Sequence, residues 1–251
     1  MMRNNALKKN PMKNPIRKGI IDVWWRPHMV EGATFTNQDV PICPSTADAP
    51  PTQLILYSEA KTIYRRELQK DKYFSHPAYV CFYEDDVKFD SKNGIWFRSD
   101  NAFKVLKHFA GIVTPDFSTY QDFPKPLKLW NTYRMRAFGH WYGIICGRKV
   151  VNNVRWGTPE TYGYCFDGIP KGSMVAIGTV GGSPKKQEDR ERFEEGLEQM
   201  MRVVAPPTII VYGSANYPCF EKIKTQGVEI ISFKSKTAAA FEKVKKRRTD
   251  R

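Results

Sequence analysis

Short apolar runs recur along this chain, and the segments between several of them have the periodicity of helices. The runs are rich in β-branched residues and lie roughly 25–35 residues apart, the spacing that strand–helix–strand units need. They include residues 54–57, 78–83, 112–113, 174–178, 208–212 and 228–231. We therefore predict an α/β fold with a mostly parallel sheet and helices on both faces. Periodicity does not distinguish a doubly wound sheet from an incomplete β/α barrel.

Two local patterns predict further elements. Asn93-Gly94, between Val87-Lys-Phe89 and the apolar triplet Ile95-Trp-Phe97, has the composition of a tight hairpin turn. The clearest helix opens at Ser183-Pro184, with serine as N-cap and proline in the first turn. Its apolar stripe consists of Phe193, Leu197, Met200, Met201 and Val204.

The net charge of +14 lies almost entirely at the two ends of the 251-residue chain. Residues 1–18 and 234–251 each carry +6, which leaves +2 for residues 19–233. We expect a basic disordered tail (1–18), a single α/β domain (19–233) and a basic C-terminal tail or short helix (234–251). Clustered positive charge favours binding to DNA or RNA, whereas a tail that only increases solubility is the alternative. The predicted nucleic-acid contacts are Lys8, Lys9, Lys13, Arg17, Lys18, Lys243, Lys245, Lys246, Arg247 and Arg248.

The five cysteines lie far apart and form no C-x-x-C pair. That pattern argues against a disulfide scaffold or a zinc finger and predicts a reducing compartment, which would be the host cytoplasm. No apolar run approaches the ~20 residues needed to cross a bilayer. The N-terminus also lacks the apolar region of a secretory signal, so we expect no membrane association.

Polar residues or glycine follow nearly every predicted strand, the position where ligands bind in both candidate architectures. One such set is acidic: Glu84 and Asp85 follow one strand, and Asp116 follows the next. These carboxylates could converge on Mg²⁺ or Mn²⁺ and support phosphoester chemistry. The alternative interpretation is a solvated acidic turn.

A second set lies where a predicted strand meets the helix that opens at Ser183. A glycine-rich turn before a helix N-terminus can bind phosphate through free backbone N–H groups. The predicted contacts are Thr179, Gly181, Gly182, Lys185 and Lys186, together with Ser118, which follows an earlier predicted strand. The turn has neither the Walker A nor the G-x-G-x-x-G pattern, and a plain tight turn with solvated lysines remains the alternative.

The third set is the run Asn153-Val-Arg155-Trp156-Gly157. A guanidinium suits phosphate, an asparagine can read a base edge, and an indole can stack on a base. We predict Trp156 as a ligand contact, and Asn153 and Arg155, with Asp116, as candidate catalytic residues. Alternatively, the indole fills the core and the asparagine side chains cap neighbouring loops.

This run, together with residues 111–118, 167–170 and 175–181, resembles a bacterial and phage family that is catalogued only as a domain of unknown function. The likeness covers roughly residues 50–235, and Asn153 and Trp156 are its most characteristic positions. Many members of that family sit in mobile elements, so the resemblance favours DNA replication, transfer, processing or host defence by association.

From these features we predict a phage or mobile-element protein that binds DNA or RNA through its basic tails and a polar rim. One alternative is a metal-dependent enzyme that acts on a nucleotide or another phosphorylated small molecule. Another is a non-catalytic binder or inhibitor of a host or phage protein.

Overall fold

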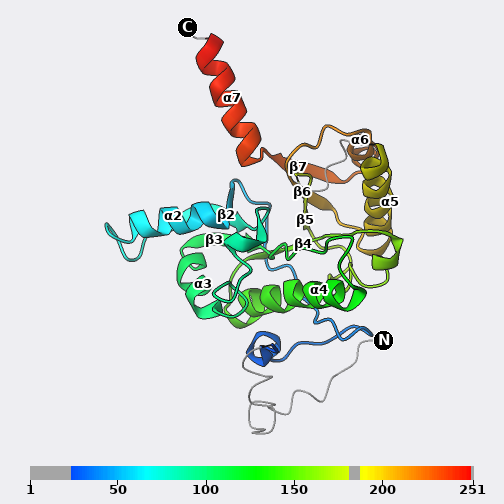
Figure 1. Ribbon diagram of the computed structural model, residues 1–251, viewed down its shortest axis with the longest axis horizontal. Coiled ribbons are helices and arrows are strands. Elements are labelled where there is room, and N and C mark those ends of the chain that lie inside the picture. The colour runs from blue at the N-terminus through cyan, green and yellow to red at the C-terminus, as the bar shows by residue number, and fades with distance from the viewer. Residues whose placement is uncertain (1–23, 181–186, 250–251) are drawn as a thin grey trace.

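Seven parallel strands form one sheet in the computed structural model, which describes residues 24–180 and 187–249. The strands are β1 (Leu54–Leu56), β2 (His76–Cys81), β3 (Phe109–Val113), β4 (Val150–Asn153), β5 (Val175–Gly178), β6 (Thr208–Tyr212) and β7 (Glu229–Phe233). Every neighbouring pair is parallel, and the strands follow one another across the sheet in chain order (Figure 1). This confirms the predicted α/β fold.

The strand order selects between the two predicted architectures. A doubly wound sheet reverses its order in the middle, whereas this order never reverses. With right-handed connections, an unreversed order places successive helices on the same side of a curling sheet, as in a β/α barrel. The protein is therefore an incomplete β/α barrel.

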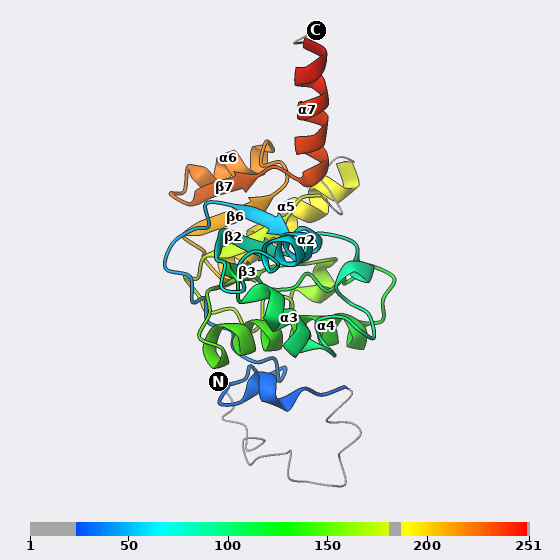
Figure 2. The ribbon, with the colours of Figure 1, turned by 90° about the vertical axis from the view of Figure 1, so that its left-hand side faces the viewer.

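Helices connect the strands and follow the last one (Figures 1 and 2). They are α2 (Tyr57–Glu67), α3 (Ser99–Leu106), α4 (Lys125–His140), α5 (Gln187–Val203), α6 (Pro218–Lys224) and α7 (Lys236–Thr249). Short 3-10 turns occur at η4 (Pro27–Val30), η5 (Asp86–Lys88) and η7 (Pro159–Thr161), and a π turn, η6 (Trp141–Ile145), extends α4. Both views show α7 projecting away from the rest of the protein. No helix in residues 24–180 or 187–249 is long and apolar enough to cross a membrane.

The strands are apolar on both faces, which explains their almost uninterrupted hydrophobic sequences. Val80, Ile112 and Val150 pack with the helix layer of the N-terminal half, together with Phe138 of α4. Alternate residues of the same strands, such as Val113 and Val151, form a separate inner cluster. The period of two residues therefore directs every second side chain to the inner face of the curled sheet.

The stripe predicted for α5 is confirmed by the burial of Phe193, Leu197 and Met200. The predicted N-cap at Ser183 lies outside the described residues.

The hairpin predicted at Asn93-Gly94 is wrong. The segment instead contains η5 and a series of turns, in which the Gly94 N–H donates to the Ser91 carbonyl at 2.7 Å. Phe89, Ile95 and Trp96 are each at most 2 % exposed and pack individually into the core beneath the helices. Burial of these side chains therefore outweighs the local preference of Asn-Gly for a two-residue hairpin turn.

Candidate functional site

A cavity of about 590 Å³ opens at the carboxyl ends of the central strands. Segments that follow β2, β3, β4 and β5 form its walls, and α4 and α5 complete them. Its lining includes Tyr83, Glu84, Asp85, Asp86, Asp116, Ser118, Tyr120, Lys128, Asn153, Arg155, Trp156, Val180, Asp189 and Arg192. The location is the one expected for a ligand site in a β/α barrel.

Asp116 is held by two donors that both come from the end of β4. Its Oδ2 lies 2.6 Å from Nη1 of Arg155, and its Oδ1 accepts a hydrogen bond of 2.8 Å from Nδ2 of Asn153. The amide oxygen of Asn153 in turn accepts a hydrogen bond of 2.9 Å from the hydroxyl of Tyr83. The carboxylate of Asp116 raises the pKa of Arg155, and burial raises the pKa of Tyr83 well above its usual value. The four side chains form one hydrogen-bonded chain across the cavity floor.

Arg136 fixes the main chain beneath this floor. It lies on α4, is fully buried, and donates from Nη1 to the Asn153 carbonyl at 2.9 Å. It also donates to the carbonyls of Asp167 and Cys165, at 2.9 and 3.3 Å. Burial lowers the pKa of Arg136 to about 10. The guanidinium therefore joins the end of β4 to the turn at residues 165–168.

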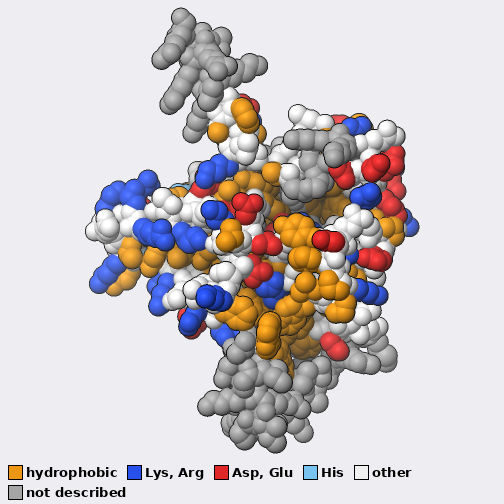
Figure 3. Space-filling view, in the orientation of Figure 1, with side chains coloured by type: hydrophobic (Ala, Val, Ile, Leu, Met, Phe, Trp, Pro, Cys, Tyr) orange, Lys and Arg blue, Asp and Glu red, His pale blue; other side chains and the backbone are white. Residues whose placement is uncertain are grey.

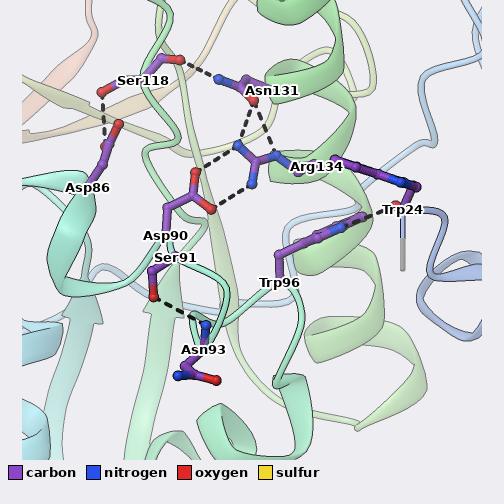
Figure 4. Close-up of polar contacts among 9 residues, drawn as sticks. All are labelled: Trp24, Asp86, Asp90, Ser91, Asn93, Trp96, Ser118, Asn131 and Arg134. Atoms are coloured by element: carbon purple, nitrogen blue, oxygen red, sulfur yellow. Dashed lines mark hydrogen bonds and ion pairs between the residues drawn. The ribbon is translucent and has the colours of Figure 1, made fainter. Parts of the chain in front are cut away.

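A second network positions Asp86 at the β2 side of the cavity (Figure 4). The Ser118 hydroxyl donates to Oδ1 of Asp86 at 2.9 Å, and the Ser118 carbonyl accepts from Nδ2 of Asn131. Asn131 accepts hydrogen bonds from Arg134, which pairs with both oxygens of Asp90 at 2.7 and 2.8 Å. Burial is the main cause that raises the pKa of Asp86, and the carboxylates of Asp90 and Asp116 add to it.

Trp156 lies between the cavity and α5. Its ring centroid is 5.3 Å from that of Phe193 and 6.5 Å from that of Phe166. A Cβ atom on Gly196 would overlap the indole ring, so α5 approaches Trp156 as closely as a glycine allows. Trp156 therefore both packs into the core and lines the cavity.

The structure brings together most of the rim residues predicted from the sequence. Glu84, Asp85, Asp116, Ser118, Asn153, Arg155 and Trp156 all line the cavity. Thr179 does not line it: the residue is buried, and its hydroxyl donates to the Ser214 carbonyl at 2.9 Å. Gly181, Gly182, Lys185 and Lys186 lie outside the described residues, as do the predicted contacts in the N-terminal tail.

The acidic residues are not gathered as a metal-ligand set. Both oxygens of Asp116 are engaged by Arg155 and Asn153, and Glu84 accepts a hydrogen bond from the backbone N–H of Ser58 at 2.8 Å. Among the residues that the structure describes, no group of three His, Cys, Asp or Glu side chains could hold a metal ion.

Sequence reasoning missed several cavity residues. Asp86 belongs to the same acidic segment after a predicted strand, so the strand-end rule includes it, but it was not selected as a candidate ligand. Lys128 and Arg192 come from α4 and α5, where a single basic residue in a helix carries no signal that it faces a cavity.

Comparison with known proteins gives a family and two phage relatives. Residues 38–234 match the family described as "Domain of unknown function (DUF4417)". The chain is 35% identical over 136 residues to the "Gene 1 protein" of Mycobacterium phage L5, which covers 54% of this chain and 57% of that protein. It is 33% identical over 136 residues to the "Gene 1 protein" of Mycobacterium phage D29, covering 54% and 48%.

This chain thus spans about half the length of these curated relatives. No solved structure matches it. The comparisons assign no residue roles, so the importance of Asn153 and Trp156 stays a prediction.

Proposed function

We propose that this chain, which belongs to the DUF4417 family of domains of unknown function, is a phage-type protein that binds DNA or RNA. In this proposal the basic terminal segments contact the phosphate backbone, and the cavity holds one nucleotide of the bound strand. The two relatives from mycobacteriophages support a role in phage biology.

The position of α7 carries the proposal. The backbone N–H of Lys236, the first residue of α7, donates to the Tyr212 hydroxyl at 3.2 Å. The Tyr212 ring stacks on that of Tyr83, with centroids 5.2 Å apart and planes inclined by 15°. Because Tyr83 lines the cavity, α7 starts at the same edge of the sheet as the cavity. A DNA or RNA strand that contacts α7 would therefore lie close to the cavity.

The distribution of charge on the protein supports a nucleic acid that runs from α7 to the cavity. The α7 sequence contains Lys243, Lys245, Lys246, Arg247 and Arg248 and a single acidic residue, Glu242. In Figure 3, acidic side chains gather over α5, whereas basic side chains gather over α2. The first residue of α7 also lies near α2, with Nζ of Lys236 3.7 Å from Glu59. A polyanion would be attracted to the side of α2 and α7 and repelled from α5.

The test measures binding of single-stranded DNA and RNA to the full chain over a range of salt concentrations. Replacing Lys245, Lys246, Arg247 and Arg248 with glutamine should weaken binding at low salt. If all four contact phosphates, the slope of log K against log salt should become shallower by about 2.8, because each phosphate contact on a single strand contributes about 0.7.

A control with the same change in net charge replaces the exposed Lys171, Arg202, Lys222 and Lys224 with glutamine. These residues lie in or next to α5 and α6, away from the basic side chains of α2, and they should change the slope much less. Equal slopes for the two variants, or no binding by the wild type, would contradict the proposal.

A further inference from the structure

The cavity carries acidic residues on one side and basic residues on the other. Glu84, Asp85 and Asp86 come from the segment after β2 and form the acidic side. Lys128, Arg155 and Arg192 come from α4, the segment after β4, and α5, and form the basic side. Two of these basic residues have carboxylate partners, because Lys128 pairs with Glu160 at 2.9 Å and Arg192 lies 3.8 Å from Asp189, which also lines the cavity. Since β3 separates β2 from β4, the strand ends that carry the two sides lie roughly 10 Å apart, or two inter-strand spacings. A ligand that fills the cavity meets both sides.

On the acidic side, Asp86 is fixed but not fully hydrogen-bonded. Two carboxylate oxygens can accept about four hydrogen bonds. In the part of the chain that the structure describes, the Ser118 hydroxyl is the one side-chain donor to the Asp86 carboxylate, and this hydrogen bond is 2.9 Å long. Asn131 and Arg134 hold Ser118 and its neighbours in place, as Figure 4 shows. Asp86 therefore presents preorganised acceptor positions in a partly desolvated place, and a ligand with N–H donors would satisfy them.

On the basic side, Arg155 keeps most of its donors. A guanidinium has five N–H groups, and the pair with Asp116 uses the group on Nη1. The side chain of Arg155 is 27 % exposed, whereas that of Asp116 is 12 % exposed. Asp116 thus orients Arg155 from below, and the remaining N–H groups are available for an anion such as phosphate.

The lining also offers a surface for a planar ring after β3, which lies between β2 and β4. Tyr120 lines the cavity there and is 51 % exposed, and Val180, which follows β5, is 46 % exposed. Bases stack on exposed aromatic rings irrespective of sequence.

We propose that the cavity binds one nucleotide whose base carries an amino group at C4 of a pyrimidine or C6 of a purine, with this amino group at Asp86, the phosphate at Arg155 and the ring against Tyr120. This inference rests on the proposed nucleic-acid function and adds to it a preference for cytosine or adenine. A carboxylate accepts a hydrogen bond from an amino group, whereas a carbonyl at the same position leaves two acceptors facing each other.

The test uses two pairs of mononucleotides that differ mainly at this position: CMP with UMP, and AMP with IMP. Calorimetric titration of the full chain should show the amino-bearing member of each pair binding more tightly, by roughly 5- to 150-fold. Cytidine should bind more weakly than CMP, because it lacks the phosphate.

Two variants separate the roles of the two sides. Asp86→Asn keeps an acceptor for Ser118 but offers the base both a donor and an acceptor, so the preference for CMP over UMP should disappear. Arg155→Lys keeps the charge beside Asp116 but loses the planar fork, so it should weaken CMP and UMP binding by the same factor. Thermal unfolding of each variant checks that it is folded.

Equal affinity within both pairs would overturn the inference, as would a preference that survives in Asp86→Asn. The absence of binding of any mononucleotide would also overturn it. A thymine-only oligonucleotide distinguishes the two proposals. If it binds with the salt dependence expected for α7 while no mononucleotide binds, the nucleic-acid function stands and the role of the cavity fails. If the oligonucleotide does not bind either, both fail.

Discussion

Replacing Gly196 with alanine tests the contact between α5 and the cavity residue Trp156. The new Cβ atom would lie 2.6 Å from Cγ of Trp156 and closer still to Cδ1 and Nε1. Ordinary contacts between carbon atoms are about 3.5–4.0 Å. Phe166 and Phe193 lie against the indole on its core side and restrict its movement to the direction of the cavity.

The expected loss of stability combines two opposing effects. Overpacking of this severity costs about 3 kcal/mol, the upper part of the usual range. Alanine in place of glycine inside a helix recovers about 1 kcal/mol. The free energy of unfolding should therefore fall by about 2 kcal/mol, and Tm by roughly 4–8 °C for a domain of this size. Urea and thermal unfolding followed by circular dichroism measure both quantities.

Two controls separate this contact from general effects of the substitution. Gly163→Ala has open space around the new Cβ atom and should change stability by less than about 0.5 kcal/mol. In a Trp156→Ala background the overlap is absent, so Gly196→Ala should stabilise the helix instead. The reasoning would be refuted if Gly196→Ala had the same effect in both backgrounds, or stabilised the wild type.

Three further predictions concern buried charged and titratable groups. Asp86→Asn should raise Tm at pH 7. Burial raises the pKa of Asp86 above its ordinary value of 3.8, so its contribution to stability is complete below pH 3.8 and is lost as pH rises through the folded pKa. A lower Tm of the variant in thermal unfolding would contradict this. Arg136→Met should lower the free energy of unfolding by at least ~3 kcal/mol, since it leaves the carbonyls of Asn153, Cys165 and Asp167 without this donor; a loss below about 1 kcal/mol in urea unfolding would show that water replaces the guanidinium. Burial raises the pKa of Tyr133 and Tyr142 from 10.0 to about 12. Their contribution should therefore be complete below pH 10 and lost as pH rises through 12. Chemical unfolding at a series of pH values checks this, and replacing both with phenylalanine should make the decline less steep, since other tyrosines with raised pKa values remain; an unchanged decline would refute the assignment.

The sequence predicted the edge of the sheet at which polar residues gather. Asp116, Asn153 and Arg155 each follow an apolar strand, and parallel strands bring their carboxyl ends to one edge. That rule needs only the strands and their direction. It does not predict which partner each side chain selects, and so it assigned Asp116 to a metal, although its oxygens contact Arg155 and Asn153.

What the sequence could not predict depends on contacts between distant segments. Whether the sheet is doubly wound or barrel-like depends on strand order, which hydrophobic periodicity does not encode. Lys128 and Arg136 are buried basic residues in α4, and their partners lie 17 or more residues away along the chain, apart from the Gln121 carbonyl. The false hairpin at Asn93-Gly94 has the same cause, because the burial of Trp96 overrides the local turn preference.

The most direct test of the whole account is photo-crosslinking to a single-stranded oligonucleotide that carries 5-iodocytosine, a base that keeps the exocyclic amino group. The crosslinked peptides are identified by mass spectrometry. We expect crosslinks to aromatic residues of the cavity, above all Tyr120, with Tyr83 and Trp156 as further candidates, and we expect excess CMP to reduce them more than excess UMP. Crosslinks confined to the far end of α2 or to the acidic face of α5, or crosslinks that CMP does not reduce, would contradict the claim that the cavity holds a nucleotide of the bound strand.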